Sequence, residues 1–227
     1  MEQVLEFLRN LSCNNNRDWF LEHKDEYKRA KTEFDAFVLE LLAEIRRFDS
    51  SIGDLAVSDM TYRIYRDVRF SKNKDPYKTH MGVYIAPGGK KSGYSGYYFH
   101  VSTDTSGGWE SGHMIAAGDY MCEPKALRIL REDIDAGDGD FRRILAGVNP
   151  MLKLEMGNAL KRVPAGFQSD SPESEFLKLK SFCVSCPVTD EFVLAPDLAV
   201  RLAEIFRSTK PFLDYVNRAI HYSRTEK

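Results

Sequence analysis

The spacing of apolar residues changes twice along this 227-residue chain and divides it into three parts. In the first and last parts apolar residues recur every three or four positions, as in residues 34–45, which is typical of amphipathic helices. Between about residues 57 and 118 they alternate with other residues, as in residues 81–85, which is typical of strands. Helices followed by strands and then by helices predict an α+β fold.

The alternating part predicts an antiparallel meander of three to four strands, packed with N-terminal and C-terminal helices. We expect the strands at residues 60–70, 81–85, 97–101 and 109–117. The helical parts are residues 1–50 and 123–222, and Pro211 predicts a kink or a break between the last two helices. Because no repeat or low-complexity linker interrupts the chain, we expect one domain that spans residues 1–227.

The charge balance argues against some classes of protein. The chain has 32 Lys and Arg against 34 Asp and Glu, and this net charge of −2 disfavours a protein that coats DNA, whose surface is usually basic throughout. No stretch approaches the roughly 18 consecutive apolar residues that a membrane span requires, and the first residues do not resemble a signal peptide. We therefore expect a cytoplasmic protein with no membrane partner.

Two of the four cysteines, Cys183 and Cys186, form a single C-x-x-C sequence. A zinc site needs two further ligands, and no second C-x-x-C sequence supplies them. A redox pair of the thioredoxin type should precede a helix, but Pro187 follows directly. We therefore expect both cysteines to be buried as small apolar residues, with no metal and no cofactor.

Positive charge is concentrated in residues 62–80, where tyrosines are interleaved with basic side chains. Six Lys or Arg residues and only two Asp residues lie between Arg63 and Lys78. Clustered cations repel one another and lose solvation when they are buried, so they need protein carboxylates or an anionic ligand as partners. The choice between these partners is the functional question.

Alternation also predicts which polar side chains share a face of the sheet. If even-numbered residues of the first expected strand face the core, the opposite face carries arginines, histidines, tyrosines and one carboxylate. Its members are Arg63, Tyr65, Asp67 and Arg69, then His80, Gly82 and Tyr84, and then Tyr98, His100 and Ser102. Arg66 falls on the core side, so it needs a buried carboxylate or a bulge near Asp67.

We interpret this face as a binding site for a small phosphorylated or carboxylated ligand, because arginine side chains bind such groups through paired hydrogen bonds. Asp67 and His100 are the candidate acid–base groups for a catalytic step. The predicted ligand-binding residues are Arg63, Arg66, Arg69, Lys72, Lys74, Tyr77, Lys78, His80 and Tyr98. Whether the protein is an enzyme stays open.

Two other interpretations also stay open. The same residues are compatible with a non-catalytic structural or interaction module, in which an Arg–Asp–Tyr network organises the first hairpin and the sheet face is solvated. Basic residues interleaved with aromatic ones are also typical of proteins that bind single-stranded nucleic acid. The nearly neutral net charge makes nucleic acid the weaker alternative, and a steep fall of affinity with salt identifies it.

Residues 63–71, followed by residues 74–79, resemble a bacterial and fungal family called domain of unknown function 2461. The resemblance covers nearly the whole chain, because it extends to residues 16–20, 97–100 and 161–167. It implies one intact domain with its main motif at residues 63–80, and it implies no established activity or cofactor. The chain departs from the family pattern near Ser171 and Pro172, where a His-Pro pair is expected.

Overall fold

The computed structural model describes residues 1–69, 73–105, 107 and 111–225. Within these residues five strands form one antiparallel sheet in the spatial order β1-β2-β3-β5-β4. The strands are β1 (His80–Ile85), β2 (Gly96–Ser102), β3 (His113–Asp119), β4 (Lys153–Leu154) and β5 (Phe182–Val188). The predicted α+β fold is confirmed, and the sheet has more strands than the three to four expected.

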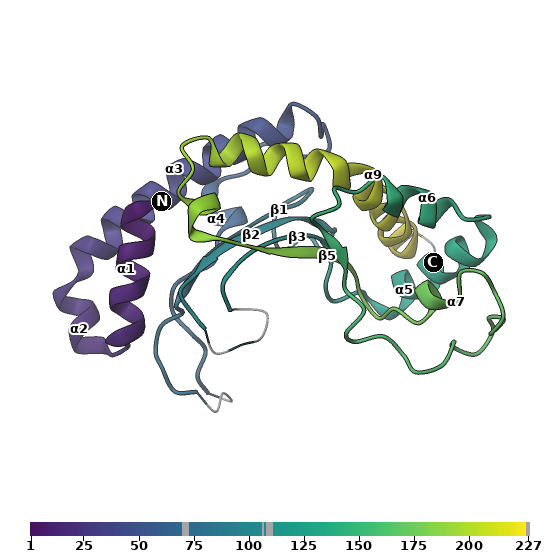
Figure 1. The fold of residues 1–227 in the computed structure, drawn as a ribbon, viewed down its shortest axis with the longest axis horizontal. Helices are drawn as coiled ribbons and strands as arrows, with labels where there is room; N and C mark the ends of the chain where they lie inside the picture. The colour runs from purple at the N-terminus through teal and green to yellow at the C-terminus, as the bar shows by residue number, and fades with distance from the viewer. Residues whose placement is uncertain (70–72, 106, 108–110, 226–227) are drawn as a thin grey trace.

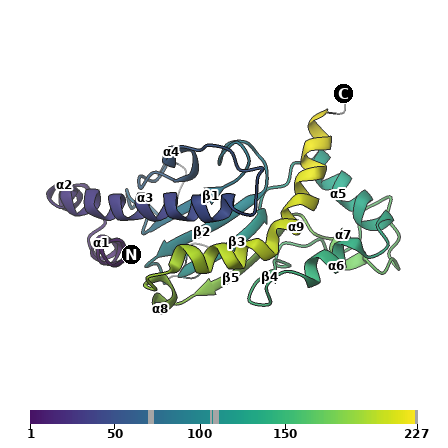
Figure 2. The ribbon, with the colours of Figure 1, turned by 90° about the horizontal axis from the view of Figure 1, so that it is seen from above.

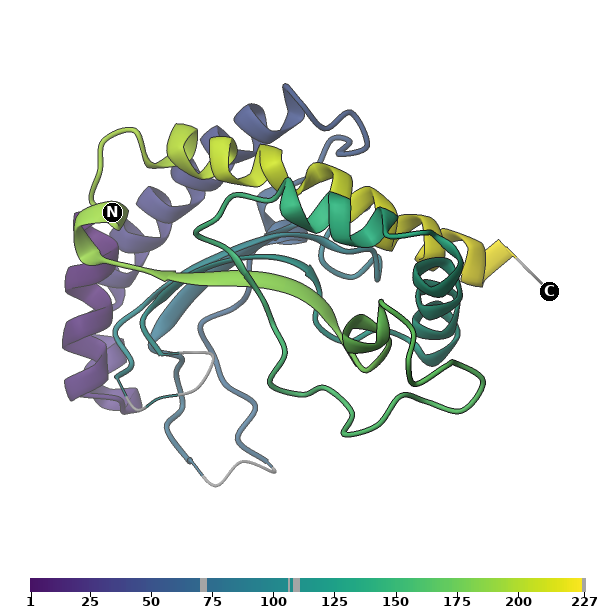
Figure 3. The same cartoon turned by 45° about the vertical axis from the view of Figure 1, so that its right-hand side comes forward.

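The described helices are α1 (Glu2–Cys13), α2 (Arg17–Glu22), α3 (Lys24–Arg46), α4 (Val57–Met60), α5 (Pro124–Ala136), α6 (Asp140–Ala146), α7 (Ser174–Leu177), α8 (Asp190–Val193) and α9 (Leu198–Thr225). α3 and α9 run together over the convex face of the curved sheet, and loops lie under its concave face (Figure 1). α5, α6 and α7 form a separate group near the C-terminal end of α9 (Figure 3). The helical layer therefore buries one face of the sheet and leaves the other to loops.

The main core lies between the sheet and helices α3 and α9. Apolar residues of α3 recur at helical spacing and are buried, as in Phe37 and Leu41. The Phe37 ring meets the Phe99 ring of β2 with 5.6 Å between centroids and 62° between planes. On the same strand, the Tyr97 ring lies 5.2 Å from the Phe206 ring of α9. Tilted aromatic pairs of this kind fix which face of β2 turns toward the helices.

α9 is a single helix of 28 residues that contains Pro211 and bends along its length (Figure 2). It replaces the expected pair of helices. A proline inside a helix removes one backbone hydrogen bond and crowds the preceding turn, which accounts for a bend. The bend lets the first part of α9 run beside α3 and the last part run beside α5. Within the described residues, no helix is both long and apolar enough to cross a lipid bilayer.

The expectation of a strand at residues 60–70 is wrong. α4 ends at Met60, and the described residues 61–69 and 73–79 instead form two arms of a loop below the sheet (Figure 1). The backbone N–H of Lys78 donates to the carbonyl oxygen of Ile64 at 2.8 Å and joins the two arms. The arms therefore pair with each other and add no strand to the sheet.

Burial explains why alternation misled the prediction for this segment. Ile64 is 3% exposed, but Tyr62 is 44% exposed, so the alternating apolar residues do not share one buried face. Arg66, which strict alternation placed on the core side, is half-buried in the loop. Phe70 and the predicted site residue Lys72 lie outside the described residues. A helical layer over so many basic side chains would remove their solvation, which costs more than the few apolar contacts return.

The sequence does not predict β5, although its residues alternate. Phe182, Val184 and Cys186 are buried in the main core, while Cys183 packs on the opposite face. A proline and two cysteines inside the strand obscured the period. The prediction that Cys183 and Cys186 are buried is confirmed, and both are free thiols.

The predicted common face of β1 and β2 is confirmed by the register of these strands. Tyr98 and His100 face the concave side of the sheet together with the residues opposite them in β1. This face is buried, not solvated, because His80 is 7% exposed, Tyr98 is 9% exposed and His100 is fully buried. The cross-strand pairs are His80 with Ser102, Gly82 with His100, and Tyr84 with Tyr98.

Candidate functional site

The base of the 61–79 loop is anchored to the N-terminal helical part. The Asn15 side chain donates to the carbonyl oxygen of Tyr77 at 3.0 Å and accepts the N–H of Tyr77 at 3.1 Å. The Tyr77 ring stacks on Phe20 with 4.0 Å between centroids and 12° between planes, and Tyr65 packs beside it. The structure therefore places Tyr77, a predicted ligand-binding residue, in the core, where it fixes the loop.

The outer part of the loop carries Arg63, Asp67, Arg69 and Lys74, which are exposed. Arg69 donates two hydrogen bonds to the Asp67 carboxylate, at 3.0 and 2.7 Å, and these bonds hold the pKa of that carboxyl at about 2. The Lys74 ammonium group donates to a carbonyl oxygen of the same loop at 3.0 Å. Asp67 and His100, the predicted acid–base groups, share no hydrogen bond in the described part of the chain.

A group of polar side chains is buried on β1 and β2. The His80 and His100 rings lie 5.6 Å apart between centroids. The Tyr98 hydroxyl lies 2.9 Å from Nδ1 of His100, and Nε2 of His100 lies 2.8 Å from the carbonyl oxygen of Gly112. We refer to His80, His100 and Tyr98 as the histidine group.

The electrostatic surroundings of His80 favour its neutral form. Burial and, to a smaller extent, the positive charges of Lys78 and Arg66 lower the pKa of His80 to about 4, although the Asp104 carboxylate acts in the opposite direction. Two predicted cations of the motif are therefore close enough to act on the histidine group. A negative charge brought to this place would be attracted by Lys78 and Arg66 at once.

Acid is expected to destabilise the protein through His80. Because the folded-state pKa of about 4 lies below the ordinary value of 6.5, the unfolded chain binds this proton first as the pH falls. The contribution of His80 to the free energy of unfolding is then full above about pH 6.5 and falls by about 3 kcal/mol between pH 6.5 and pH 4. Urea unfolding at several pH values, for the wild type and for His80→Gln, measures it.

The variant should lose this part of the pH dependence. His221→Gln, which removes an exposed histidine of α9, is the matched control and should keep it. If the free energy of unfolding of His80→Gln depended on pH as steeply as that of the wild type, the imidazole of His80 would not titrate as described.

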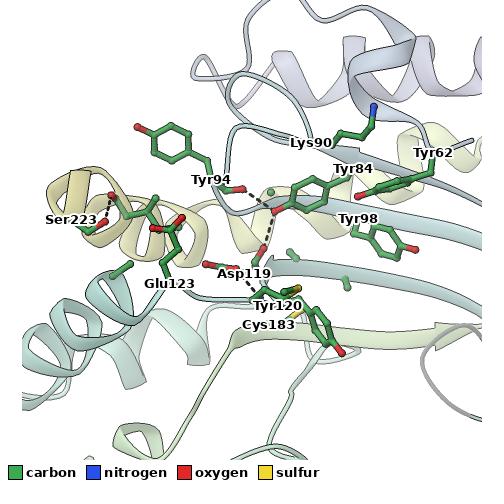
Figure 4. A pocket seen from close by; sticks show the side chains of 18 of the residues that line it. Tyr62, Tyr84, Lys90, Tyr94, Tyr98, Asp119, Tyr120, Glu123, Cys183 and Ser223 are labelled. Atoms are coloured by element: carbon green, nitrogen blue, oxygen red, sulfur yellow. Dashed lines mark hydrogen bonds between the residues drawn. The ribbon is translucent and has the colours of Figure 1, made fainter. Parts of the chain in front are cut away.

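A cavity of about 340 Å³ opens beside the histidine group (Figure 4). It lies between the concave face of the sheet, the start of α5 and the end of α9. Small residues of the sheet leave this space open, and tyrosines surround it. The lining includes Gly96, Ala116 and Gly118 and the side chains of Tyr62, Tyr84, Tyr94, Tyr98 and Tyr120. The volume falls in the range of about 300–1,000 Å³ that is typical of small-molecule sites.

Cations stand at the edge of the cavity, above aromatic rings. The ammonium groups of Lys78 and Lys90 lie 5.5 and 5.9 Å from the centroid of the Tyr62 ring. The Arg224 guanidinium lies 4.7 Å from the centroid of the Tyr94 ring. The negative face of an aromatic ring attracts a cation at these distances. Tyr62 therefore connects the basic motif to the cavity.

The interior of the cavity disfavours charge. Burial raises the pKa of the Asp119 carboxyl, and it raises the pKa of the Cys183 thiol to about 12, so Cys183 is not an activated nucleophile. The Tyr84 hydroxyl lies 2.9 Å from the carbonyl oxygen of Tyr94 and 3.2 Å from that of Gly118. Its hydrogen-bonding capacity is thus directed at the backbone. The cavity interior suits an uncharged, flat group with a charge at its edge.

The structure brings together one half of the predicted site and separates the other half. The residues around the histidine group are Arg66, Lys78, His80, Tyr98 and His100. The residues in the outer loop or the core are Arg63, Asp67, Arg69, Lys74 and Tyr77. Sequence reasoning missed cavity residues that come from distant segments, namely Tyr62, Lys90, Tyr94, Asp119 and Arg224. The positions of Tyr84 and Tyr98 on the predicted face were the signals of the cavity.

A protein-family model matches residues 3–215 of the chain. The matching family is described as Conserved hypothetical protein (DUF2461). No curated protein and no solved structure matches the chain. Because the match extends over most of the 227 residues, and because the motif at residues 63–79 resembles the same family, this chain belongs to the DUF2461 family.

Proposed function

We propose that this protein binds a small ligand that carries a phosphate or carboxylate group and a flat apolar part, at the concave face of its sheet. The position of Tyr62 carries the proposal. Its ring lines the cavity and at the same time lies within 6 Å of the ammonium groups of Lys78 and Lys90. A ligand whose flat part contacts the tyrosines can therefore place its anion beside two cations.

The charges around His80 support the same proposal. Lys78 and Arg66 both act on this buried imidazole, which stays neutral near pH 7. Among the described residues, two cations and one carboxylate, Asp104, act on it. A phosphate or carboxylate bound here would be attracted by both cations in a partly buried place, where attraction is screened less than in water.

A structural role is the second candidate function of the motif, and specific contacts favour it for other residues. The Phe20–Tyr77 stack fixes the loop, and the Arg69–Asp67 ion pair closes its outer part. These contacts account for part of the motif without any ligand. They do not account for the cavity or for the cations above Tyr62.

Replacing Lys78 with alanine is expected to weaken binding of phenyl phosphate about tenfold or more. A hydrogen bond to a charged group contributes about 1.5–3 kcal/mol, and about 1.4 kcal/mol corresponds to a tenfold change in affinity. Isothermal titration at low salt measures it, with inorganic phosphate and a short single-stranded DNA as comparison ligands. The phenyl group should improve on phosphate alone, because it fills the tyrosine-lined cavity.

Lys74→Ala is the matched control, since Lys74 lies in the same loop and bonds a loop carbonyl. It should bind phenyl phosphate as the wild type does. If Lys78→Ala and Lys74→Ala lost affinity for phenyl phosphate equally, or if the wild type bound no anion, the proposal would be contradicted. Tighter binding of DNA with a steep salt dependence would instead favour the nucleic-acid alternative.

A further inference from the structure

Tyr98 connects the cavity to the histidine group. Its ring lines the cavity, and its hydroxyl points away from the Tyr84 hydroxyl in Figure 4. At that end the hydroxyl lies 2.9 Å from Nδ1 of His100. Gly82, opposite His100 on β1, has no side chain, and a Cβ atom there would lie 3.2 Å from the Tyr98 hydroxyl oxygen. The glycine thus leaves the room that this hydroxyl occupies.

The backbone determines which atom of the pair holds the proton. The carbonyl oxygen of Gly112 can only accept a hydrogen bond, so Nε2 of His100 carries the hydrogen in the 2.8 Å contact between them. In the neutral ring Nδ1 is then an acceptor, and the Tyr98 hydroxyl donates to it. The hydroxyl proton is therefore directed at a base.

We propose that Tyr98 and His100 form a proton-transfer pair, in which Tyr98 exchanges a proton with a ligand in the cavity and His100 is the base behind it. A ligand O–H or N–H bond breaks as its proton moves to the oxygen of Tyr98. The Tyr98 O–H bond breaks in turn as its own proton moves to Nδ1 of His100. The ligand is left with one more negative charge and His100 with one positive charge, so atoms and charge balance.

The surroundings stabilise the ligand anion and orient the imidazole of the pair. The negative charge on the ligand forms near Lys78 and Arg66, which act on the adjacent His80. The Gly112 carbonyl faces the imidazolium that forms on His100 and orients it. Tyr84, which lines the same cavity, has its hydroxyl between backbone carbonyls, which cannot take a proton. The inference rests on the proposed function only in that both need a ligand in this cavity.

Reaction with an aryl sulfonyl fluoride tests the pair without a known substrate. The Tyr98 oxygen attacks sulfur, a sulfur–oxygen bond forms, fluoride leaves, and the hydroxyl proton passes to His100. In the wild type, Tyr98 is expected to react with benzenesulfonyl fluoride at least about 100-fold faster than Tyr120, because general-base assistance typically contributes about 100-fold or more. Tyr120 is 65% exposed at the same cavity, so exposure alone predicts the opposite order. Peptide mapping by mass spectrometry measures both rates.

His100→Asn should lower the Tyr98 rate by about 100-fold, because an amide oxygen accepts the hydroxyl hydrogen bond but does not take its proton. Tyr98→Phe should remove the product altogether. An unchanged rate in a folded His100→Asn variant overturns the pair. If that variant does not fold, the wild-type comparison decides, and a Tyr120 rate equal to or above that of Tyr98 overturns it.

A second reagent separates this inference from the proposed function. The para-carboxy derivative of benzenesulfonyl fluoride adds an anion to the same aromatic ring. If the anion site exists, this reagent should modify Tyr98 faster than the neutral one, and phenyl phosphate should compete with it. If the two reagents modify Tyr98 at the same rate and phenyl phosphate does not compete, the proposed anion site is contradicted. Fast reaction of Tyr98 would still support the proton-transfer pair in that case. No modification of Tyr98 by either reagent overturns the pair.

Discussion

Replacing Gly118 with alanine is expected to lower the free energy of unfolding by about 4 kcal/mol, through backbone strain and overpacking. The φ angle of Gly118 is 135°, which side-chain-bearing residues rarely adopt. A Cβ atom there would also lie 2.0 Å from the carbonyl oxygen of Phe182 in β5. β3 and β5 would have to separate at the floor of the cavity. Urea denaturation measures the change.

Gly157→Ala is the matched control. No heavy atom of the described residues outside the immediate chain lies within 4 Å of the Cβ position at Gly157, and its φ is not positive. This variant should stay within about 0.5 kcal/mol of the wild type. If Gly118→Ala is equally stable, β3 and β5 are not as close as described.

Replacing Asp49 with alanine is expected to lower the free energy of unfolding by about 3–5 kcal/mol, since it breaks a buried, hydrogen-bonded charge cluster. The Asp49 carboxylate is 3% exposed and joins three elements at the helical side of the sheet. It accepts the Tyr97 hydroxyl of β2 at 2.8 Å and the Ser51 hydroxyl at 2.6 Å, and Lys210 of α9 lies 3.7 Å away. The substitution leaves the Tyr97 hydroxyl buried without its acceptor.

A double-mutant cycle separates this loss from a general effect of the substitution. Tyr97→Phe should cost about 1–3 kcal/mol in the wild type and much less in the Asp49→Ala background, because the acceptor is already gone. Asp54→Ala is the control, since Asp54 is 93% exposed and pairs with Arg46 at the surface. If the double variant lost as much free energy of unfolding as the two single variants together, the side chains of Asp49 and Tyr97 would not act together.

Alternation of apolar residues predicted which side chains of β1 and β2 lie on the concave face. Successive side chains of a strand point to opposite faces, so a buried Phe99 requires Tyr98 and His100 to share the other face. This inference needs no knowledge of distant residues. It therefore held for β1 and β2 and failed at residues 60–69, where Thr61 makes a single bridge to Val83 of β1 and Tyr65 pairs with Tyr77 of the same loop.

The composition of the motif predicted a cluster of positive charge but not the partner of each basic side chain. Arg69 and Lys78 are equally basic in the sequence, yet Arg69 pairs with Asp67 in the outer loop while the ammonium group of Lys78 lies 5.5 Å from the centroid of the Tyr62 ring. Which cation meets a carboxylate and which meets an aromatic ring depends on how the two arms of the loop return to the sheet. That path is set by long-range contacts such as those of Asn15 with the loop backbone.

Local sequence thus sufficed for the longer helices, for three of the strands and for the side chains of β1 and β2 on the concave face, because backbone periodicity is a short-range property. It did not predict the short helices α4 and α8. Tertiary structure alone decided that this face is enclosed, that Gly96 and Gly118 line a cavity beside it, and that the end of α9 completes the cavity. It also decided the hydrogen bond of His100 to Gly112, which orients Tyr98. These features join residues far apart in the chain, and their positions depend on the packing of the whole fold.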